Sequence, residues 1–163
     1  MEPIIRHARE SDIERITEIT LKQWAPVFAS YKNLIGEELY EIWFKNQKEE
    51  KVQTVTKQAL DSNHCIVTEI DGYVVGFAVF FYQTAANGDK VGVLTNNAVD
   101  SDFGGRGLGT KQYEYIFDLM RKEGCVSVSV ATGLDDAHAP ARRAYEKAGF
   151  EKGIPQIRYF KKL

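Results

Sequence analysis

The sequence predicts a mixed α/β (α+β) domain, in which a mostly antiparallel β-sheet has helices on both faces and includes one parallel pair of strands. Three observations lead to this fold. Strand-like segments separated by short turns follow one another over 64–99. A glycine cluster then opens a long amphipathic helix over 104–124, and an alternating apolar strand follows at 126–132. A strand, a helix and a second strand in this order form parallel neighbours, because the helix carries the chain back across the sheet.

The N-terminal part is predicted to be a short strand followed by a helix. The strand covers 3–8, and a capping box between Ser11 and Glu14 begins a helix that reaches about Gln23. The next segment, 24–36, is rich in aromatic residues and contains a proline. We therefore expect this segment to be a loop with some helical turns.

Two further helices are expected at 37–48 and 51–60, where apolar residues recur at helical spacing. A polar break at 61–63 ends the second of them. The residues expected to face inward are Leu39, Ile42, Trp43, Val52, Val55 and Ala59.

The central strands are expected to form an antiparallel meander over 64–70, 73–82 and 91–99. Asp71-Gly72 is a strong signal for a two-residue hairpin, because the favoured turns need positive φ at their central residues. Asn87-Gly88 marks the second turn.

The C-terminal part adds a strand between two helices. The helix after the glycine cluster ends at Gly124, where a left-handed C-cap is expected. After the strand at 126–132, a helix opens near Asp135 and ends at Gly149. The last strands are expected at 150–152 and 156–162.

Length and composition indicate a single domain, 1–163, of ordinary size. Hydrophobic residues make up 44% and charged residues 27% of the chain, as is typical of a soluble globular protein. The 21 basic and 23 acidic residues give a net charge of −2, which argues against a nucleic-acid binder that depends on bulk positive charge.

Cysteine and histidine usage argues against a metal or a disulfide. Cys65 and Cys125 lie within or beside apolar runs, which favours buried free thiols. The 3 histidines have no metal-ligand spacing, so no metal is expected. The N-terminus does not look like a signal peptide, and no apolar run approaches membrane-spanning length. We therefore expect a cytoplasmic protein that contacts no membrane.

The glycine cluster Gly104–Thr110 indicates a binding site for a phosphate or pyrophosphate. Its 4 glycines within 6 residues leave room for an anion, and the first N–H groups of a helix have no carbonyl partners. A tight turn that binds nothing is the alternative. The dinucleotide fingerprint fails because Thr110 stands where its third glycine belongs. The P-loop pattern fails because Thr110-Lys111 reverses the required order.

Two motifs of the chain match those of one enzyme family. In the loop motif Arg/Gln-x-x-Gly-x-Gly/Ala, Gly107 and Gly109 match, whereas Gly104 replaces the Arg or Gln and Arg106 supplies charge nearby. The second motif has an Asn, an Ala, a Tyr and Gly-Phe at fixed spacing along a helix. Its matches are Ala141, Tyr145, Gly149 and Phe150, with His138 in the Asn position. The chain thus resembles the GNAT superfamily of acetyl-CoA-dependent N-acetyltransferases over nearly its whole length.

The resemblance implies an acetyl-CoA site where the strand at 91–99 and its parallel neighbour splay apart. Backbone groups near Ala98 and Val99 would pair with the pantetheine and polarise the thioester carbonyl. For His138, a capping or surface role is the alternative to cofactor contact. The residues that the resemblance assigns to the cofactor are Ala98, Val99, Gly104, Gly105, Arg106, Gly107, Leu108, Gly109, Thr110 and His138.

The resemblance makes Tyr145 the expected general acid toward the CoA thiolate. A phenol with a pKa of about 10 stabilises a thiolate by a hydrogen bond even without full proton transfer. The alternative is a core tyrosine on an apolar helix face. No general base is assigned, because Thr95, Asn96 and Asn97 occupy the region where many family members place a Glu. Other candidates, besides an ordered water, are Glu69, Asp100, Asp135, His64 and His138.

The expected reaction is direct transfer, within a ternary complex, to the primary amine of a small molecule or peptide. By resemblance the segment 24–36 lies over the acceptor, with Trp24, Phe28 and Tyr31 either lining a pocket or, in part, belonging to the core. A polyamine, an aminoglycoside-like drug, an amino acid and a peptide N-terminus remain open as acceptors.

Two other functions remain as alternatives. A non-catalytic acyl-CoA sensor or binding module is favoured by the unassigned base and by Gly104. A P-loop-like nucleotide binder is disfavoured by the order Thr110-Lys111. Homodimers are common in the family, although no feature of this sequence indicates one.

Overall fold

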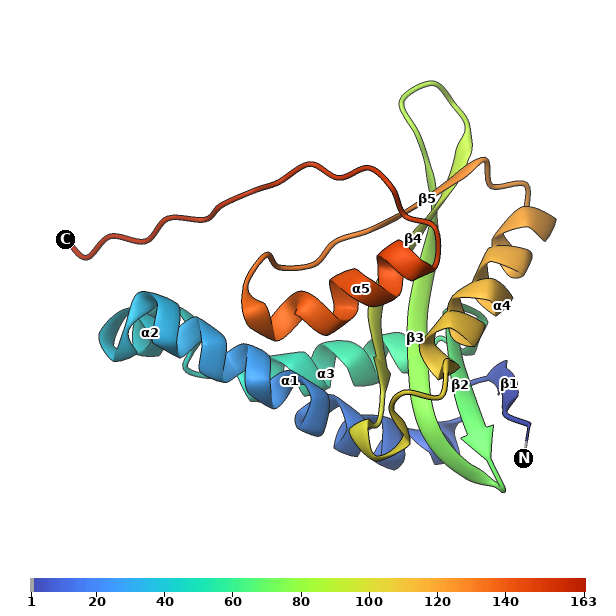
Figure 1. The fold of residues 1–163 in the computed structure, drawn as a ribbon, viewed down its shortest axis with the longest axis horizontal. Helices are drawn as coiled ribbons and strands as arrows, with labels where there is room; N and C mark the ends of the chain where they lie inside the picture. The colour runs from blue at the N-terminus through green and yellow to red at the C-terminus, as the bar shows by residue number, and fades with distance from the viewer. Residues whose placement is uncertain (1) are drawn as a thin grey trace.

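The computed structural model describes residues 2–163 and confirms the mixed α/β fold (Figure 1). Its sheet has the order β1-β2-β3-β4-β5. β2, β3 and β4 form the predicted antiparallel meander, β1 pairs antiparallel with β2, and β5 lies parallel to β4. The strands are β1 (Ile4–His7), β2 (Cys65–Ile70), β3 (Tyr73–Thr84), β4 (Lys90–Val99) and β5 (Ser127–Val130).

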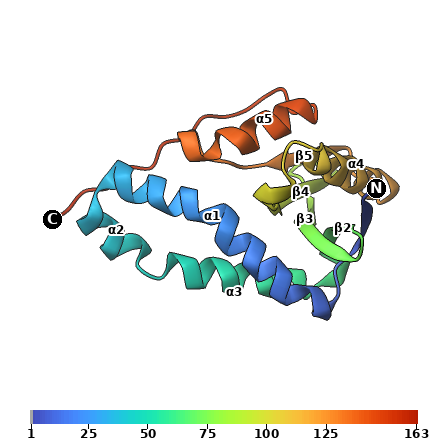
Figure 2. The ribbon, with the colours of Figure 1, turned by 60° about the horizontal axis from the view of Figure 1, so that its bottom comes forward.

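Helices cover both faces of the sheet (Figure 2). One layer contains α1 (Ile13–Ile35), α2 (Glu37–Phe44) and α3 (Gln47–Ala59). The opposite layer contains α4 (Leu108–Lys122) and α5 (Ala139–Lys147). Single 3-10 turns lie at Glu10–Asp12, Ser62–His64, Ser101–Phe103 and Asp136–His138. Within residues 2–163, no helix has the length and apolar character that crossing a membrane requires.

One turn and one strand pair fix the shape of the sheet. Asp71 and Gly72 have φ of 51° and 79°, so the hairpin lies where the dipeptide predicts it. The parallel pairing of β4 with β5 ends at Leu94 and Val130. Beyond that pair the two strands separate, and this opening becomes the floor of the site described below.

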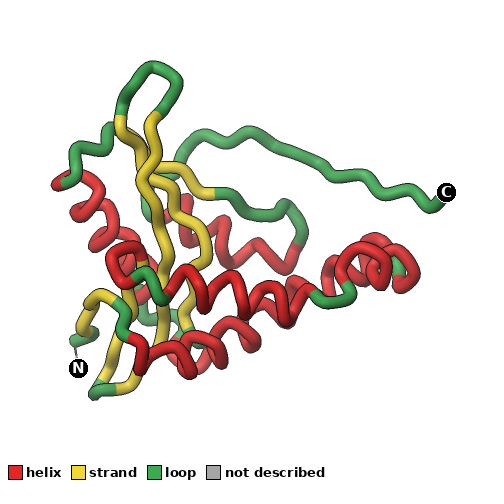
Figure 3. Tube along the Cα trace, turned by 180° about the vertical axis from the view of Figure 1, so that it is seen from behind, coloured by secondary structure: helices red, strands yellow, loops and turns green. Residues whose placement is uncertain are grey.

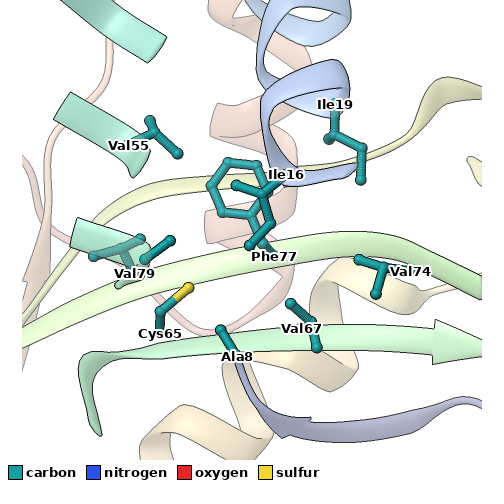
Figure 4. Close-up of a cluster of buried hydrophobic side chains, with 10 residues drawn as sticks. Ala8, Ile16, Ile19, Val55, Cys65, Val67, Val74, Phe77 and Val79 are labelled. Carbon is teal, nitrogen blue, oxygen red and sulfur yellow. The ribbon is translucent and has the colours of Figure 1, made fainter. Parts of the chain in front are cut away.

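Alternation of side chains along β3 divides the core between the two faces. Phe77 and Val79 point toward α1 and α3, where they pack with Ile16 (Figure 4). Ala78 and Phe80 point toward α4 and α5. The two clusters together hold the sheet between the helical layers, because each face removes its own apolar surface from water.

Residues 24–35 of the segment 24–36 are helical, so the predicted loop is wrong. α1 continues through Pro26 and ends at Ile35. Pro26 has no N–H for the carbonyl one turn earlier, but the residue is exposed and water can bind that carbonyl. Beyond it, Val27 and Phe28 are only 9% and 4% exposed. Their packing outweighs the lost hydrogen bond.

The start of α1 and the orientation of α2 also differ from the predictions. The carboxylate of Asp12, rather than that of Glu14, accepts a backbone N–H, from Arg9 at 2.8 Å. Ile42 and Trp43 were expected to face inward but are 62% and 53% exposed. The reason is that α2 packs at the end of the helical layer, away from the sheet (Figure 2).

The strands predicted at 150–152 and 156–162 do not form. After α5 the chain runs as an extended segment away from the sheet, as Figure 3 shows from behind. The ring of Phe160 packs on Trp43 of α2, with centroids 5.6 Å apart. Pro155 also has no N–H to give to a strand ladder. The segment is thus held beside α2, and β5 remains an edge strand of the described sheet.

Both cysteines are free thiols, as expected. Cys65 is fully buried on β2, and burial raises its pKa to about 12. Cys125 is half-buried beside β5, and its pKa is also raised by burial. Neither thiol is therefore an effective nucleophile at neutral pH.

Candidate active site

A cleft of about 1020 Å³ lies where β4 and β5 separate. Its floor is formed by 95–99 at the end of β4 and by 131–133 after β5. One wall comes from α1 and α3, and the other comes from the glycine cluster, α4 and α5. A concave site of this size, bounded by both helical layers, can enclose a ligand of cofactor size.

The glycine cluster forms the turn into α4. Gly105 and Gly107 have φ of 74° and 73°, a conformation that residues with a Cβ rarely adopt. The Lys111 N–H bonds the Gly107 carbonyl at 3.1 Å, so the N–H groups of 108–110 precede the first helical hydrogen bond. Because 107–110 line the cleft, these N–H groups and the helix dipole can stabilise an anion there.

Asp100 fixes the start of this loop to α1. The side chain is almost fully buried, and its Oδ1 accepts bonds from the Asp102 N–H at 3.1 Å and from Lys22 at 2.6 Å. The other carboxylate oxygen pairs with Arg15. Burial alone would raise the pKa of Asp100, but the bonds from Lys22, Asp102 and Arg15 hold that pKa at about 2. The carboxylate is therefore ionised at any physiological pH.

The structure brings nearly all of the expected cofactor residues together on the cleft. Arg106 is not among them, because it is exposed and its guanidinium lies 5.4 Å from the ring centroid of Phe103. The expected cofactor residues that do line the cleft are Ala98, Val99, Gly104, Gly105, Gly107, Leu108, Gly109, Thr110 and His138.

Two neighbouring asparagines on β4 point toward opposite walls, because successive side chains of a strand alternate between its faces. Around Thr95 the pairing with β3 shifts register, which leaves one extra residue on β4 and sets which asparagine faces which wall. Asn96 then points to α3, where it donates to Gln58 at 2.7 Å and accepts from Lys51 at 3.1 Å. Asn97 points to α4 and α5. Asn96 and Asn97 therefore face different halves of the cleft.

Asn97 holds Tyr145 through a network of three side chains. The Asn97 amide donates to the Tyr145 hydroxyl at 3.0 Å, and the Tyr113 hydroxyl donates to the Asn97 carbonyl oxygen at 2.7 Å. The Tyr145 hydroxyl lies 3.4 Å from that same oxygen, which is a weaker geometry. The bond from the Asn97 amide uses the Tyr145 hydroxyl as an acceptor, so the Tyr145 proton is held only by the weaker 3.4 Å contact and can turn to a ligand. Tyr145 also lines the cleft.

Burial sets the protonation of both tyrosines. It raises the pKa of Tyr145, and the hydrogen bonds with Asn97 and Tyr113 offset part of the rise. It also raises the pKa of Tyr113. Both phenols consequently keep their protons at neutral pH, and Tyr145 is available there as a proton donor.

A polar cluster around His138 joins α1 to the start of α5. His138 Nδ1 lies 2.5 Å from Asp135 Oδ1, and the Ser30 hydroxyl donates to Asp135 Oδ2 at 2.5 Å. The His138 ring stacks on Tyr31, with centroids 6.1 Å apart. Burial alone would raise the pKa of Asp135, but the bonds from Ser30 and His138 outweigh it and lower that pKa. A Cβ on Gly133 would lie 2.5 Å from His138 Nδ1, so only glycine leaves room for the pair.

The candidates for a general base are scattered. Glu69 pairs with Arg6 at 2.8 Å and His64 pairs with Asp61 at 2.8 Å, both away from the cleft. Asp100 is paired with side chains of α1. His138 lines the cleft, whereas Asp135 is not among the lining residues. Among residues 2–163, no cluster of His, Cys, Asp and Glu is suited to hold a metal ion.

The expected acceptor residues divide between the cleft and the core. Trp24 and Tyr31 line the cleft, whereas Phe28 is 4% exposed and belongs to the core. Sequence reasoning missed Lys51, because only the packing of α3 against α1 brings that side chain to the cleft. It also missed Asn97, which was noted only as a residue that cannot act as a base. The nearby Tyr145 motif was the one available signal.

Comparisons with known proteins agree with this geometry. The model of the acetyltransferase (GNAT) family matches residues 28–150. An S-(2-succino)cysteine N-acetyltransferase of Bacillus subtilis is 25% identical, with an alignment that covers 96% of this chain and 88% of the relative.

Solved structures share the fold at lower identity. A transcriptional regulator from Bacillus halodurans superposes with a TM-score of 0.68 at 18% identity, over 98% of this chain and 100% of its own. The aminoglycoside N-acetyltransferase AAC(6')-Iy, solved in complex with CoA, superposes with a TM-score of 0.63 at 18% identity, over 99% of this chain and 96% of its own.

Proposed function

The chain belongs to the GNAT family of acetyltransferases, and we propose that it transfers the acetyl group of acetyl-CoA to the primary amine of a small molecule or peptide. The observation that carries this proposal is the meeting of an anion-binding helix N-terminus and a protonated, cleft-lining Tyr145 in one cleft. The family membership makes the protein an N-acetyltransferase. The acceptor and the roles of individual residues are the proposed part.

The residues of the cleft fit CoA. The N–H groups of 108–110 would hold the pyrophosphate, and the part of β4 beyond Leu94, which is not paired with β5, would bond the pantetheine as an added strand. When bound, acetyl-CoA supplies an activated acetyl thioester. The related fold solved with CoA supports this assignment.

Tyr145 is proposed as the general acid. Asn97 fixes the phenol oxygen as a hydrogen-bond acceptor, so the hydroxyl proton can point to the sulfur of the departing CoA thiolate. The proton is present at neutral pH, because burial raises the pKa of Tyr145. The hydrogen bond from Asn97 also stabilises the negative charge that grows on the phenol oxygen as the proton leaves.

Transfer is proposed to be direct, without an acetylated enzyme. Neither Cys65 nor Cys125 lines the cleft, and burial raises the pKa of both thiols. The acceptor amine would approach from the wall formed by α1 and α3, on which Trp24 and Tyr31 lie. Both substrates would then be present together when the acetyl group moves.

The named relatives suggest which acceptors to test. The curated relative is an S-(2-succino)cysteine N-acetyltransferase, and one structural relative is an aminoglycoside N-acetyltransferase. The first is named for an acceptor with several carboxylates, and the second for acceptors with several amines. A panel that contains both kinds, together with polyamines and peptides, covers the acceptors considered for this chain.

The test combines binding and turnover on the purified protein. Calorimetric titration with acetyl-CoA is run beside Mg-ATP and Mg-GTP, and release of the CoA thiol is then followed across the amine panel. We expect saturable acetyl-CoA binding, no nucleotide response, and thiol release with at least one amine. Acetyl-CoA binding without turnover on any amine would favour a non-catalytic acyl-CoA sensor. Nucleotide binding alone would overturn the cofactor assignment.

A further inference from the structure

Lys51 lies on the wall of the cleft that would receive the acceptor. Its side chain comes from α3 and is half-buried. Its Nζ donates to the side-chain oxygen Oδ1 of Asn96 at 3.1 Å and lies 5.0 Å from the ring centroid of Trp24. The ammonium is therefore held at the β4 bulge, next to the residue that positions Tyr145.

The ammonium of Lys51 has no carboxylate partner within residues 2–163, because no Asp or Glu oxygen there lies within 4.0 Å of its Nζ. The two groups that it contacts, Asn96 and Trp24, are uncharged. Lys22 on α1 is different, since it pairs with Asp100 and Asp102. Burial lowers the pKa of Lys51, so an anion beside it would stabilise its charged form.

Gln47 adds a second unmet polar group on the same helix, one turn before Lys51. Its Oε1 is shielded from solvent and receives no hydrogen bond from the described residues, although the residue itself lines the cleft. Buried polar atoms of native proteins nearly always have partners. Lys51 and Gln47 thus form a polar patch on α3 that the described residues leave incomplete.

The charges on the cleft oppose a polycationic acceptor. Among the described residues that line it, Asp136 is the one carboxylate, and it belongs to the turn before α5 rather than to the acceptor wall. The acceptor wall itself carries the positive charge of Lys51. An amine with several positive charges would meet repulsion there and find no acidic partner.

We propose that Lys51 binds a carboxylate of the acceptor, so that the substrates are amines that also carry a carboxylate, as amino acids and their side-chain derivatives do. The inference rests on the proposed acetyl transfer and adds the class of acceptor. Lys51 is bonded to Asn96, and Tyr145 is bonded to Asn97. Asn96 and Asn97 are adjacent in the floor of the cleft, so Lys51 and Tyr145 face the same cleft from its two walls.

The test pairs each amino acid with its carboxamide, which keeps the amine and removes the carboxylate charge. Thiol release is measured for both members of each pair with the wild type, Lys51→Met and Lys57→Met. Methionine keeps the length of the lysine stem, and Lys57 is an exposed lysine on the same helix that serves as the matched control. Acetyl-CoA affinity is measured for all three proteins by calorimetry.

We expect the wild type to prefer the acids. Lys51→Met should raise the KM for the acids by about tenfold, because a hydrogen bond to a charged group is lost, and should leave the KM for the carboxamides within about twofold. Lys57→Met should behave as the wild type, and all three should bind acetyl-CoA equally. Lys51→Arg should restore part of the preference for the acids.

Equal or better turnover of carboxamides and diamines by the wild type would overturn the role of Lys51 and leave acetyl transfer standing. An equal loss on both members of each pair in Lys51→Met would also overturn it, because such a loss indicates a packing role. Absence of thiol release with every amine would instead overturn the proposed function.

Discussion

The two walls of the cleft are built from different parts of the chain, although they meet at neighbouring residues of β4. The cofactor wall is made mainly of backbone, from the glycine cluster and the end of β4. The acceptor wall is made of side chains on α1 and α3, such as Trp24 and Lys51. Asn97 belongs to the first wall and Asn96 to the second. A backbone wall suits a ligand that stays the same, whereas in our proposal the side-chain wall selects the amine.

The largest effect on turnover is expected at Tyr145, on the cofactor side. Tyr145→Phe removes the proposed proton donor and keeps the ring, so kcat should fall by about 100-fold. Acetyl-CoA affinity, measured by calorimetry, should change little. Tyr115→Phe on α4 is the matched control, because Tyr115 is only partly buried and does not line the cleft. Unchanged kcat in Tyr145→Phe would remove this residue from the chemistry.

The next effect concerns the backbone of the cofactor wall. Gly107 has φ of 73°, and Gly107→Val forces a β-branched residue into that conformation. The strain of about 2 kcal/mol is relieved when the loop moves its N–H groups, so the acetyl-CoA dissociation constant should rise by about 30-fold.

Gly88→Val is the control for strain alone, since Gly88 has φ of 89° in the turn before β4. Gly88→Val should lower the melting temperature, as a strained glycine position does, without changing the affinity for acetyl-CoA. Equal losses of affinity in both variants would mean that the loop conformation is not what binds the cofactor.

Asn96 and Asn97 provide the sharpest test that the two walls of the cleft have separate roles. Asn97→Ala removes a hydrogen bond that partly offsets the rise in the pKa of Tyr145. The pKa should therefore rise further and the phenol become a weaker acid, which lowers kcat by about tenfold and moves the alkaline limb of the pH profile upward. Asn96→Ala should instead raise the KM for the acceptor, through Lys51, with kcat preserved. Identical effects of the two variants would show that the walls are not separate.

The effect expected at Asp100, which joins the start of the glycine loop to α1, is on stability more than on turnover. Its pKa of about 2 lies below the ordinary 3.8, so the carboxylate stabilises the fold above about pH 4 and this contribution is lost as the pH falls toward 2. Asp100→Asn should lower the free energy of unfolding at pH 7 by about 2 kcal/mol. The difference from the wild type should shrink below pH 4.

Denaturant unfolding at several pH values measures this difference. Asp102→Asn is the matched control, because the Asp102 side chain is mostly exposed and pairs with Lys22, which also pairs with Asp100. A difference that stays constant down to pH 3 would show that the ion pairs of Asp100 do not stabilise the fold.

The sequence predicts the cofactor wall better than the acceptor wall for a physical reason. The anion binding proposed at 104–110 depends on glycines and on a helix start, both of which are local properties that a motif contains. The tyrosine at 145 is likewise found from its spacing along one helix. Lys51 reaches the cleft only because α3 packs against α1, and no local pattern contains that information.

The two larger errors in the fold predicted from the sequence have similar causes. The helix through Pro26 persists because burial of Val27 and Phe28 outweighs one lost hydrogen bond. The extended C-terminal segment leaves the sheet because Phe160 contacts Trp43 on a distant helix. In both cases tertiary contacts overrule a local signal.

The central claim is that one cleft holds acetyl-CoA and the amine together, each on its own wall. Initial rates of thiol release, measured while both substrates are varied, test it most directly. Direct transfer predicts reciprocal plots that intersect, and no acetylated protein detectable by mass spectrometry after incubation with acetyl-CoA alone. Parallel plots, together with an acetylated protein that passes its acetyl group to the amine, would contradict the account.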